Sequence, residues 1–172
     1  MSAYDLRVRA AEIRELILRY AQTWDPDQRG ELWSRLNHLG VLRSKASNPT
    51  GDYAEWLVAR HYNRPLEAPS NKGFDLTLTD GTRIEVRGRH IKGRDPTYFK
   101  VARDLLSAIY DRLALVFFNP DFSVRWACEI PREALEDFAV KYENTDHRLR
   151  LRTRGLPGAW IDHPTVKPLP LV

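Results

Sequence analysis

The stretch that most restricts how this chain can fold is residues 73–90, "GFDLTLTDGTRIEVRGRH". Apolar and polar residues alternate on both sides of Asp80-Gly81, which is a dipeptide typical of tight turns. The alternation predicts a β-hairpin, in which successive side chains point to opposite faces. The length of the turn then decides which polar side chains meet across the two strands.

Two turn lengths give different faces. With a two-residue turn, Glu85 shares a face with the apolar Phe74 and Leu76. A three-residue loop over 79–81, with Gly81 in the left-handed conformation, keeps every apolar residue on one side. We therefore predict the three-residue loop. Its cross-strand pairs are Leu78 with Thr82, Leu76 with Ile84, and Asp75 with Glu85.

This register places Asp75, Glu85 and Arg87 on the same face. Two carboxylates held close together either raise a pKa or bind a cation. A hard cation such as Mg²⁺ prefers oxygen ligands of this kind. The alternative is an exposed cluster of surface charges, partly neutralised by Arg87.

The rest of the chain predicts helices over 4–24, 29–39, 50–62, 97–110 and 131–142, and strands over 111–119 and 123–131. The first helix has an apolar stripe that includes Ile13 and Trp24, and the fourth turns Val101, Leu105 and Ile109 inward. The continuous apolar run of the first strand predicts burial on both faces. This order indicates an α/β or α+β sheet covered by helices. A loop near 41–51 divides a helical region, 1–46, from a core and C-terminal extension, 47–172.

Arginines gather near the C-terminus in "RLRLRTRG", in a chain of net charge +4 and pI about 9.3. In a strand, alternation puts them on one face. They form either a charged, solvated edge strand or a stripe that binds phosphates. The stripe consists of Arg148, Arg150, Arg152 and Arg154.

Composition narrows the class of protein. No apolar run approaches membrane-spanning length, and one cysteine excludes an intramolecular disulfide, so we expect a cytoplasmic protein without a membrane partner. Cys128 lies in a strand-like run, so we predict that it is a small, buried apolar residue. The five histidines show no metal-ligand spacing. Trp56 is most simply a packing residue, and stacking on a base is its other use.

The segments "KGFDL" and "RIEVRG", preceded by a helix with "GDYAEWLVA", resemble the restriction-endonuclease-like superfamily, the PD-(D/E)XK nucleases. The resemblance covers about residues 50–131. It implies a core of order α-β-β-β-α-β, with a mixed central sheet flanked by helices and with the N-terminal helices added to it.

The resemblance also implies roles for individual residues. Asp75 matches the metal-binding aspartate, Glu85 matches the acid of the (D/E)-x-K motif, and the carbonyl of Val86 completes the metal site. Glu55 matches the helix acid of many members. Arg87 stands where the family has lysine; it can hold a phosphate but does not readily act as a base.

The expected function is therefore that of an endonuclease, a hydrolase that uses Mg²⁺ or Mn²⁺ to cleave phosphodiester bonds of DNA. The Arg stripe would contact the nucleic-acid backbone, and a homodimer would suit cleavage of a duplex. Two alternatives stay open. One is a catalytically degenerate nucleic-acid-binding module of the same fold, and the other is an interaction protein that binds an acidic partner.

Overall fold

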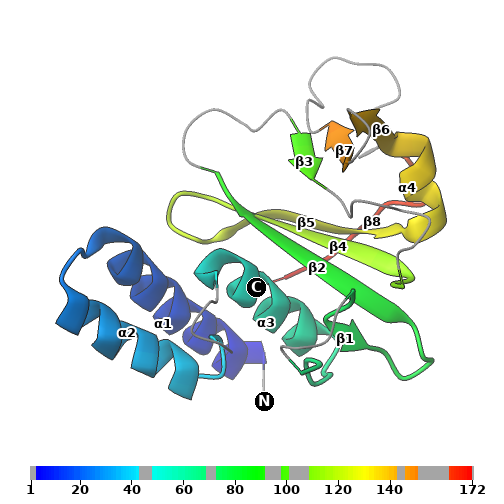
Figure 1. The fold of residues 1–172 in the computed structure, drawn as a ribbon. Helices are drawn as coiled ribbons and strands as arrows, with labels where there is room; N and C mark the ends of the chain where they lie inside the picture. The colour runs from blue at the N-terminus through cyan, green and yellow to red at the C-terminus, as the bar shows by residue number, and fades with distance from the viewer. Residues whose placement is uncertain are drawn as a thin grey trace.

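The structure, a computed structural model, describes residues 3–42, 48–68, 73–91, 98–100, 109–142, 146–150 and 163–171. A five-stranded mixed sheet in the order β1-β2-β4-β5-β8 forms its centre (Figure 1). Strands β2 and β4 are parallel, and the other neighbours are antiparallel. The predicted α/β class is confirmed. The strands are β1 (Leu76–Thr77), β2 (Arg83–His90), β4 (Arg112–Phe118), β5 (Val124–Pro131) and β8 (Lys167–Pro168).

Helices α1 (Ala3–Gln22), α2 (Pro26–His38) and α3 (Pro49–His61) follow one another in the chain, with α3 packed against β2 and the other two lying beside it (Figure 1). Each of the last two begins at a proline after a capping residue, Asp25 or Asn48, whose side chain accepts backbone N–H groups. One apolar cluster contains side chains of all three helices and of the central strands. The N-terminal helices therefore share their core with the sheet.

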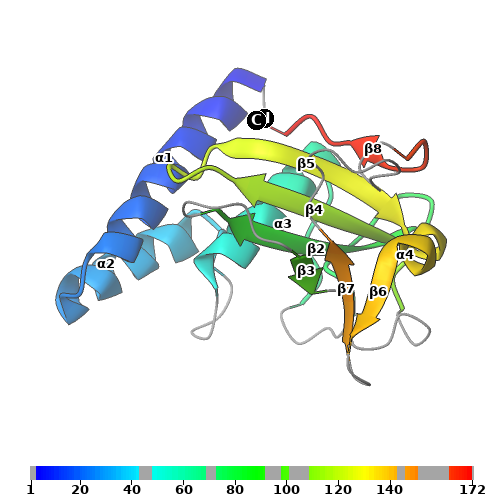
Figure 2. The ribbon, with the colours of Figure 1, turned by 90° about the horizontal axis from the view of Figure 1, so that it is seen from above.

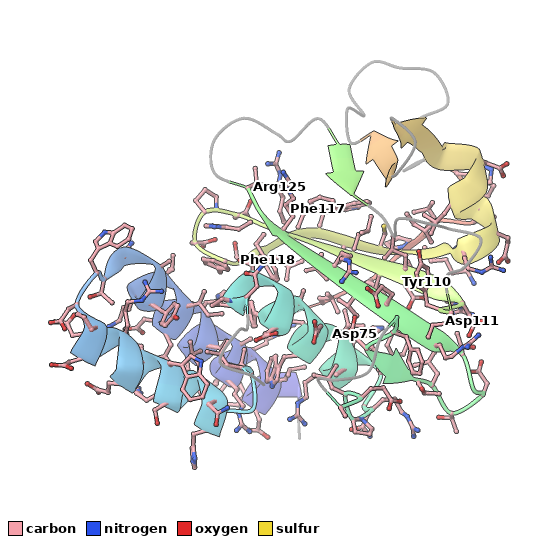
Figure 3. The ribbon with its side chains drawn as sticks, viewed as in Figure 1. Asp75, Tyr110, Asp111, Phe117, Phe118 and Arg125 are labelled. Carbon is pink, nitrogen blue, oxygen red and sulfur yellow. The ribbon has the colours of Figure 1, made fainter. Side chains whose placement is uncertain are left out.

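Strand β4 is buried on both sides, as its apolar run predicts. Phe118 packs in the cluster beneath α3, whereas Phe117 belongs to a second cluster on the other face, and Figure 3 shows the two side chains on opposite sides of the strand. Helix α4 (Arg132–Phe138) contributes Leu135 to the second cluster. Cys128 is fully buried there, as expected.

A separate three-stranded sheet lies on the side of α4 and has the order β3-β7-β6 (Figure 2). Its strands are β3 (Tyr98–Lys100), β6 (Ala139–Tyr142) and β7 (Asp146–Arg150). The predicted helix over 97–110 is wrong at Tyr98–Lys100, whose backbone pairs with β7. The helix predicted over 131–142 spans only α4, because Pro131 ends β5 and Ala139–Tyr142 also pairs with β7.

Two expected core positions differ as well. Ile109 is 43% exposed rather than inward, and Val101 and Leu105 lie outside the described residues. Trp24 is 89% exposed because α1 ends at Gln22 and the chain then turns into the cap of α2. Ile13 is buried, as predicted.

None of the helices in the described part of the chain combines the length and the apolar character needed to cross a membrane.

Candidate metal centre on the hairpin

The hairpin has the loop that the sequence predicts. Gly81 has φ +86°, its N–H donates to the carbonyl of Leu78, and the N–H of Leu78 donates to the carbonyl of Thr82. This is a three-residue loop with a left-handed glycine, which an L side chain would strain. Leu76 pairs with Ile84 as predicted. The register brings Asp75 next to the middle of β2.

Regular pairing stops at Asp75, which holds β2 in two ways. Its N–H donates to the carbonyl of Ile84 at 2.8 Å, and its carboxylate Oδ2 accepts the N–H of Val86 at 2.7 Å. The side chain thus accepts a hydrogen bond that a backbone carbonyl of β1 would accept if the strand continued. Figure 3 shows Asp75 beside β2 at the end of β1.

The predicted face of Phe74 is wrong. Strict alternation places it with Leu76, but Phe74 packs against the second apolar cluster, on the opposite face of the sheet. The irregular backbone at Asp75 is the reason, because alternation of side chains holds only through a regular ladder. The rest of the apolar face agrees with the prediction, since Leu76 and Ile84 are both fully buried.

Glu85 is a buried acid, with 7% of the residue exposed. It alternates with Ile84 and Val86, which face α3, so its side chain points to the opposite face of β2. Burial raises the pKa of Glu85 to about 7. The positive charge of Arg87 lowers this pKa, and the negative charge of Asp75 raises it further. The carboxyl therefore keeps its proton to a higher pH than an ordinary glutamate does.

Arg87 lies on the same face and forms an ion pair with Glu85 Oε1 through Nη2. Its Nη1 donates to the carbonyl of Val86 at 3.5 Å, the long limit of a hydrogen bond. The guanidinium thus contacts two of the three groups expected to hold a metal. Its side chain is 47% exposed, so it reaches from the buried acid to solvent.

Tyr110 is a neighbour that the sequence does not indicate. It is 3% exposed, and its hydroxyl has no hydrogen-bond partner in the described part of the structure. Burial raises the pKa of Tyr110 to about 12, and the charge of Glu85 adds to this effect. Tyr110 comes just before β4, and the parallel pairing of β4 with β2 brings it within electrostatic range of Glu85. The sequence signal that could have indicated Tyr110 is its position as a polar residue at the start of the strand that follows the hairpin.

Glu55 lies on α3 and is partly buried. Helix α3 packs against the face of β2 that carries Ile84 and Val86, which is the face opposite Glu85. The structure thus brings Asp75, Glu85 and the backbone of Val86 together, and it places Glu55 on the helix behind them.

The Arg stripe is described only in part. Arg148 and Arg150 lie in β7, the middle strand of the three-stranded sheet, so the interpretation as an edge strand is wrong. The strand is internal because β3 and β6 pair with it on both sides. Arg152 and Arg154 lie outside the described residues.

The donor set fits a hard divalent cation. Asp75 and Glu85 supply carboxylate oxygens and Val86 supplies a carbonyl, which are the ligand types that Mg²⁺ and Mn²⁺ prefer. A nearby cation would also stabilise the ionised form of a buried carboxyl whose pKa is near 7, because a positive charge favours that form. No cluster of three or more acidic, histidine or cysteine side chains suited to a metal occurs among the described residues.

Compared with models of protein families and with curated proteins, the sequence matches none.

Proposed function

We propose that this chain is a metal-dependent nuclease-type domain that hydrolyses phosphodiester bonds of DNA on a restriction-endonuclease-like core. The observation that carries the proposal is the pairing of Asp75 with a buried Glu85, whose pKa is raised to about 7. Burying an acid that is not fully neutral costs stability, and such arrangements concentrate at functional sites. A purely structural role would be served as well by an apolar side chain.

The order of elements supports the same proposal. Helix α3 is followed by the β1–β2 hairpin, by β3 in the separate sheet, by β4 parallel to β2, and by antiparallel β5. The acids lie on the hairpin, at the positions that the resemblance assigns to metal ligands. A fold alone does not define an activity, so the acids carry the functional argument.

Asp75, Glu85 and the carbonyl of Val86 would hold Mg²⁺ or Mn²⁺. When bound, the metal lowers the pKa of a water molecule and polarises the phosphodiester. Asp75 also orients the donor set, since its bond to the N–H of Val86 keeps the two acidic strands in register.

Arg87 would change partners during binding. In the structure it compensates the charge of Glu85 and contacts the carbonyl of Val86. A cation on these two groups would replace the guanidinium, and the half-exposed side chain would then hold a phosphate with its planar donors. The Arg stripe would contact the nucleic-acid backbone.

The test is cleavage of plasmid DNA and of short single-stranded and duplex DNA with Mg²⁺ or Mn²⁺. We expect cleavage that EDTA stops and that Asp75→Ala abolishes. Asp137→Asn, which changes an exposed acid on α4, is the matched control and should leave cleavage intact. If the protein neither cleaves nucleic acid nor binds either metal in calorimetry, the proposal fails.

A catalytically degenerate nucleic-acid-binding module is the second candidate, and one contact favours it. The ion pair of Arg87 with Glu85 supplies a permanent positive charge at the expected metal position. This candidate predicts salt-sensitive DNA binding without turnover. Arg87→Lys separates the two: gain of cleavage would indicate a degenerate nuclease site, whereas loss of existing cleavage would show that Arg87 is adapted to the chemistry.

A further inference from the structure

A second candidate site is a pocket at the C-terminal end of α3. A pocket of about 480 Å³ is lined there by residues of α3 and of the segment that follows it, together with Gly40. The other described lining residues are Trp56, Ala59, Arg60, Asn63, Arg64, Pro65 and Leu66. They include two arginines and no acid, so the described wall of the pocket is positively charged.

Trp56 adds a buried hydrogen-bond donor. It is 1% exposed, which excludes it from stacking on a base, and its indole Nε1 is buried without a hydrogen-bond partner in the described part of the chain. Buried donors are rarely left without an acceptor. Trp56 lines the adjoining pocket, so a ligand whose binding uncovers the indole N–H would supply its acceptor.

The local fold holds both arginines at the pocket. The Arg60 guanidinium lies over the Trp56 ring, 5.6 Å from its centroid. Asn63 has φ +51°, a left-handed conformation that asparagine adopts more readily than most residues, and it turns the chain after α3. Arg64 follows, and its Nε donates to the carbonyl of Thr77 at 3.0 Å, which fixes the side chain while its terminal nitrogens stay available.

We propose that this pocket binds a phosphate group, either of a free nucleotide or at the end of a nucleic-acid strand. Guanidinium groups match phosphate in charge and in the spacing of their donors. The three non-bridging oxygens of a phosphate provide an acceptor for each of Arg60, Arg64 and the Trp56 N–H, whereas a carboxylate has two oxygens. The site lies on the α3 side of the sheet, away from Glu85, and does not rest on the proposed nuclease activity.

The pocket is also connected to Asp75. Leu66, which lines it, pairs with Leu76, and the N–H of the next residue, Glu67, donates to the carbonyl of Asp75 at 2.8 Å. A ligand that orders this segment therefore acts on backbone that holds the acidic hairpin.

Calorimetry with inorganic phosphate and with deoxyadenosine monophosphate tests the site directly. We expect one equivalent to bind. Arg60→Gln should weaken binding about tenfold, which corresponds to the loss of a single charge-assisted bond. Trp56→Phe should weaken binding as well, and because Trp56 is a fully buried core side chain this variant should also lower the melting temperature. Arg35→Gln on α2 removes the same charge elsewhere and should not change the affinity. The proposal is overturned if the protein binds neither phosphate compound and no phosphorylated oligonucleotide. It is also overturned if Arg60→Gln binds phosphate as tightly as wild type does.

Short oligonucleotides distinguish the two sources. If a strand end is the ligand, an oligonucleotide with a 5′-phosphate binds more tightly than the same strand with a 5′-hydroxyl, and Arg60→Gln removes the difference. If a free nucleotide is the ligand, the two strands bind alike while the nucleotide binds in an Arg60-dependent way. Tighter binding of succinate than of phosphate would overturn the assignment to phosphate.

Discussion

The carboxylate of Asp75 accepts the backbone N–H of Val86, with 2.7 Å between Oδ2 and N. One side chain thus joins the two strands of the hairpin at the point where their backbone pairing stops. Asp75 also raises the pKa of Glu85 by its charge. Its structural and its electrostatic role can be separated by substitution.

Asp75→Asn keeps a carbonyl oxygen that can accept the Val86 N–H, whereas Asp75→Ala leaves this donor without its partner. We expect Asp75→Ala to lower the free energy of unfolding by about 1–3 kcal/mol, the cost of an unsatisfied buried donor, and Asp75→Asn to lower it by less. Both variants should lose Mg²⁺ binding. Urea denaturation and calorimetry measure the two effects, and equal destabilisation by both variants would contradict the structural role.

The hairpin was predictable because the information that determines it is local. A period of two and one glycine with positive φ were sufficient to select the loop and the pairing of Leu76 with Ile84. Phe74 was not predictable in the same way. Its face depends on how the Asp75 side chain bonds to the backbone of β2, and the alternation of residue types does not indicate that bond.

Contacts between distant segments were the other limit. Tyr110 comes within electrostatic range of Glu85 because β2 and β4 pair in parallel, with Ile84 opposite Arg112. Tyr98–Lys100 forms a strand where the sequence predicts helix, because its partner strand, β7, comes much later in the chain. Strand preference depends on such partners more than on the segment itself.

Stability should decrease as pH rises through the range in which Glu85 ionises. An acid whose pKa is raised from 4.5 to about 7 on folding holds its proton more tightly in the folded state. Its contribution is therefore greatest below about pH 4.5 and is lost as the pH approaches 7, by up to about 3 kcal/mol.

Urea denaturation of wild type and Glu85→Gln between pH 4.5 and 8 measures this effect. The difference in unfolding free energy between the two proteins should shift in favour of Glu85→Gln as pH rises, since the amide never ionises. Glu31→Gln, an exposed position on α2, should stay parallel to wild type. Parallel curves for Glu85→Gln as well would show that Glu85 titrates at its ordinary value.

Mg²⁺ should stabilise the protein more at pH 8 than at pH 6. Protons compete with the cation for Glu85, whose pKa of about 7 lies between these values. A ligand at one hundred times its Kd adds about 2.7 kcal/mol to the folded state. Thermal unfolding in MgCl₂ and in NaCl of equal ionic strength measures the gain. The shift should be absent in Asp75→Asn and in Glu85→Gln, and a shift retained by both would place the cation elsewhere.

Gly88 allows α3 to approach the strand that carries Glu85 and Arg87. A Cβ at this position would lie 2.5 Å from the carbonyl oxygen of Thr50 and 2.7 Å from the Cβ of Ala54. Neither atom is at the end of a flexible side chain, so Gly88→Ala must move the helix away from β2. We expect a loss of about 1–3 kcal/mol in the free energy of unfolding, as for other overpacked cores.

Gly51→Ala is the matched control, because it makes the same chemical change within α3 itself. The Cβ added there would come no nearer than 4.0 Å to the Asn48 side chain, outside the helix backbone. Alanine has the higher helix propensity, so this variant should gain up to about 1 kcal/mol. Denaturation in urea compares the two directly. No destabilisation by Gly88→Ala would contradict the close approach of α3 to β2.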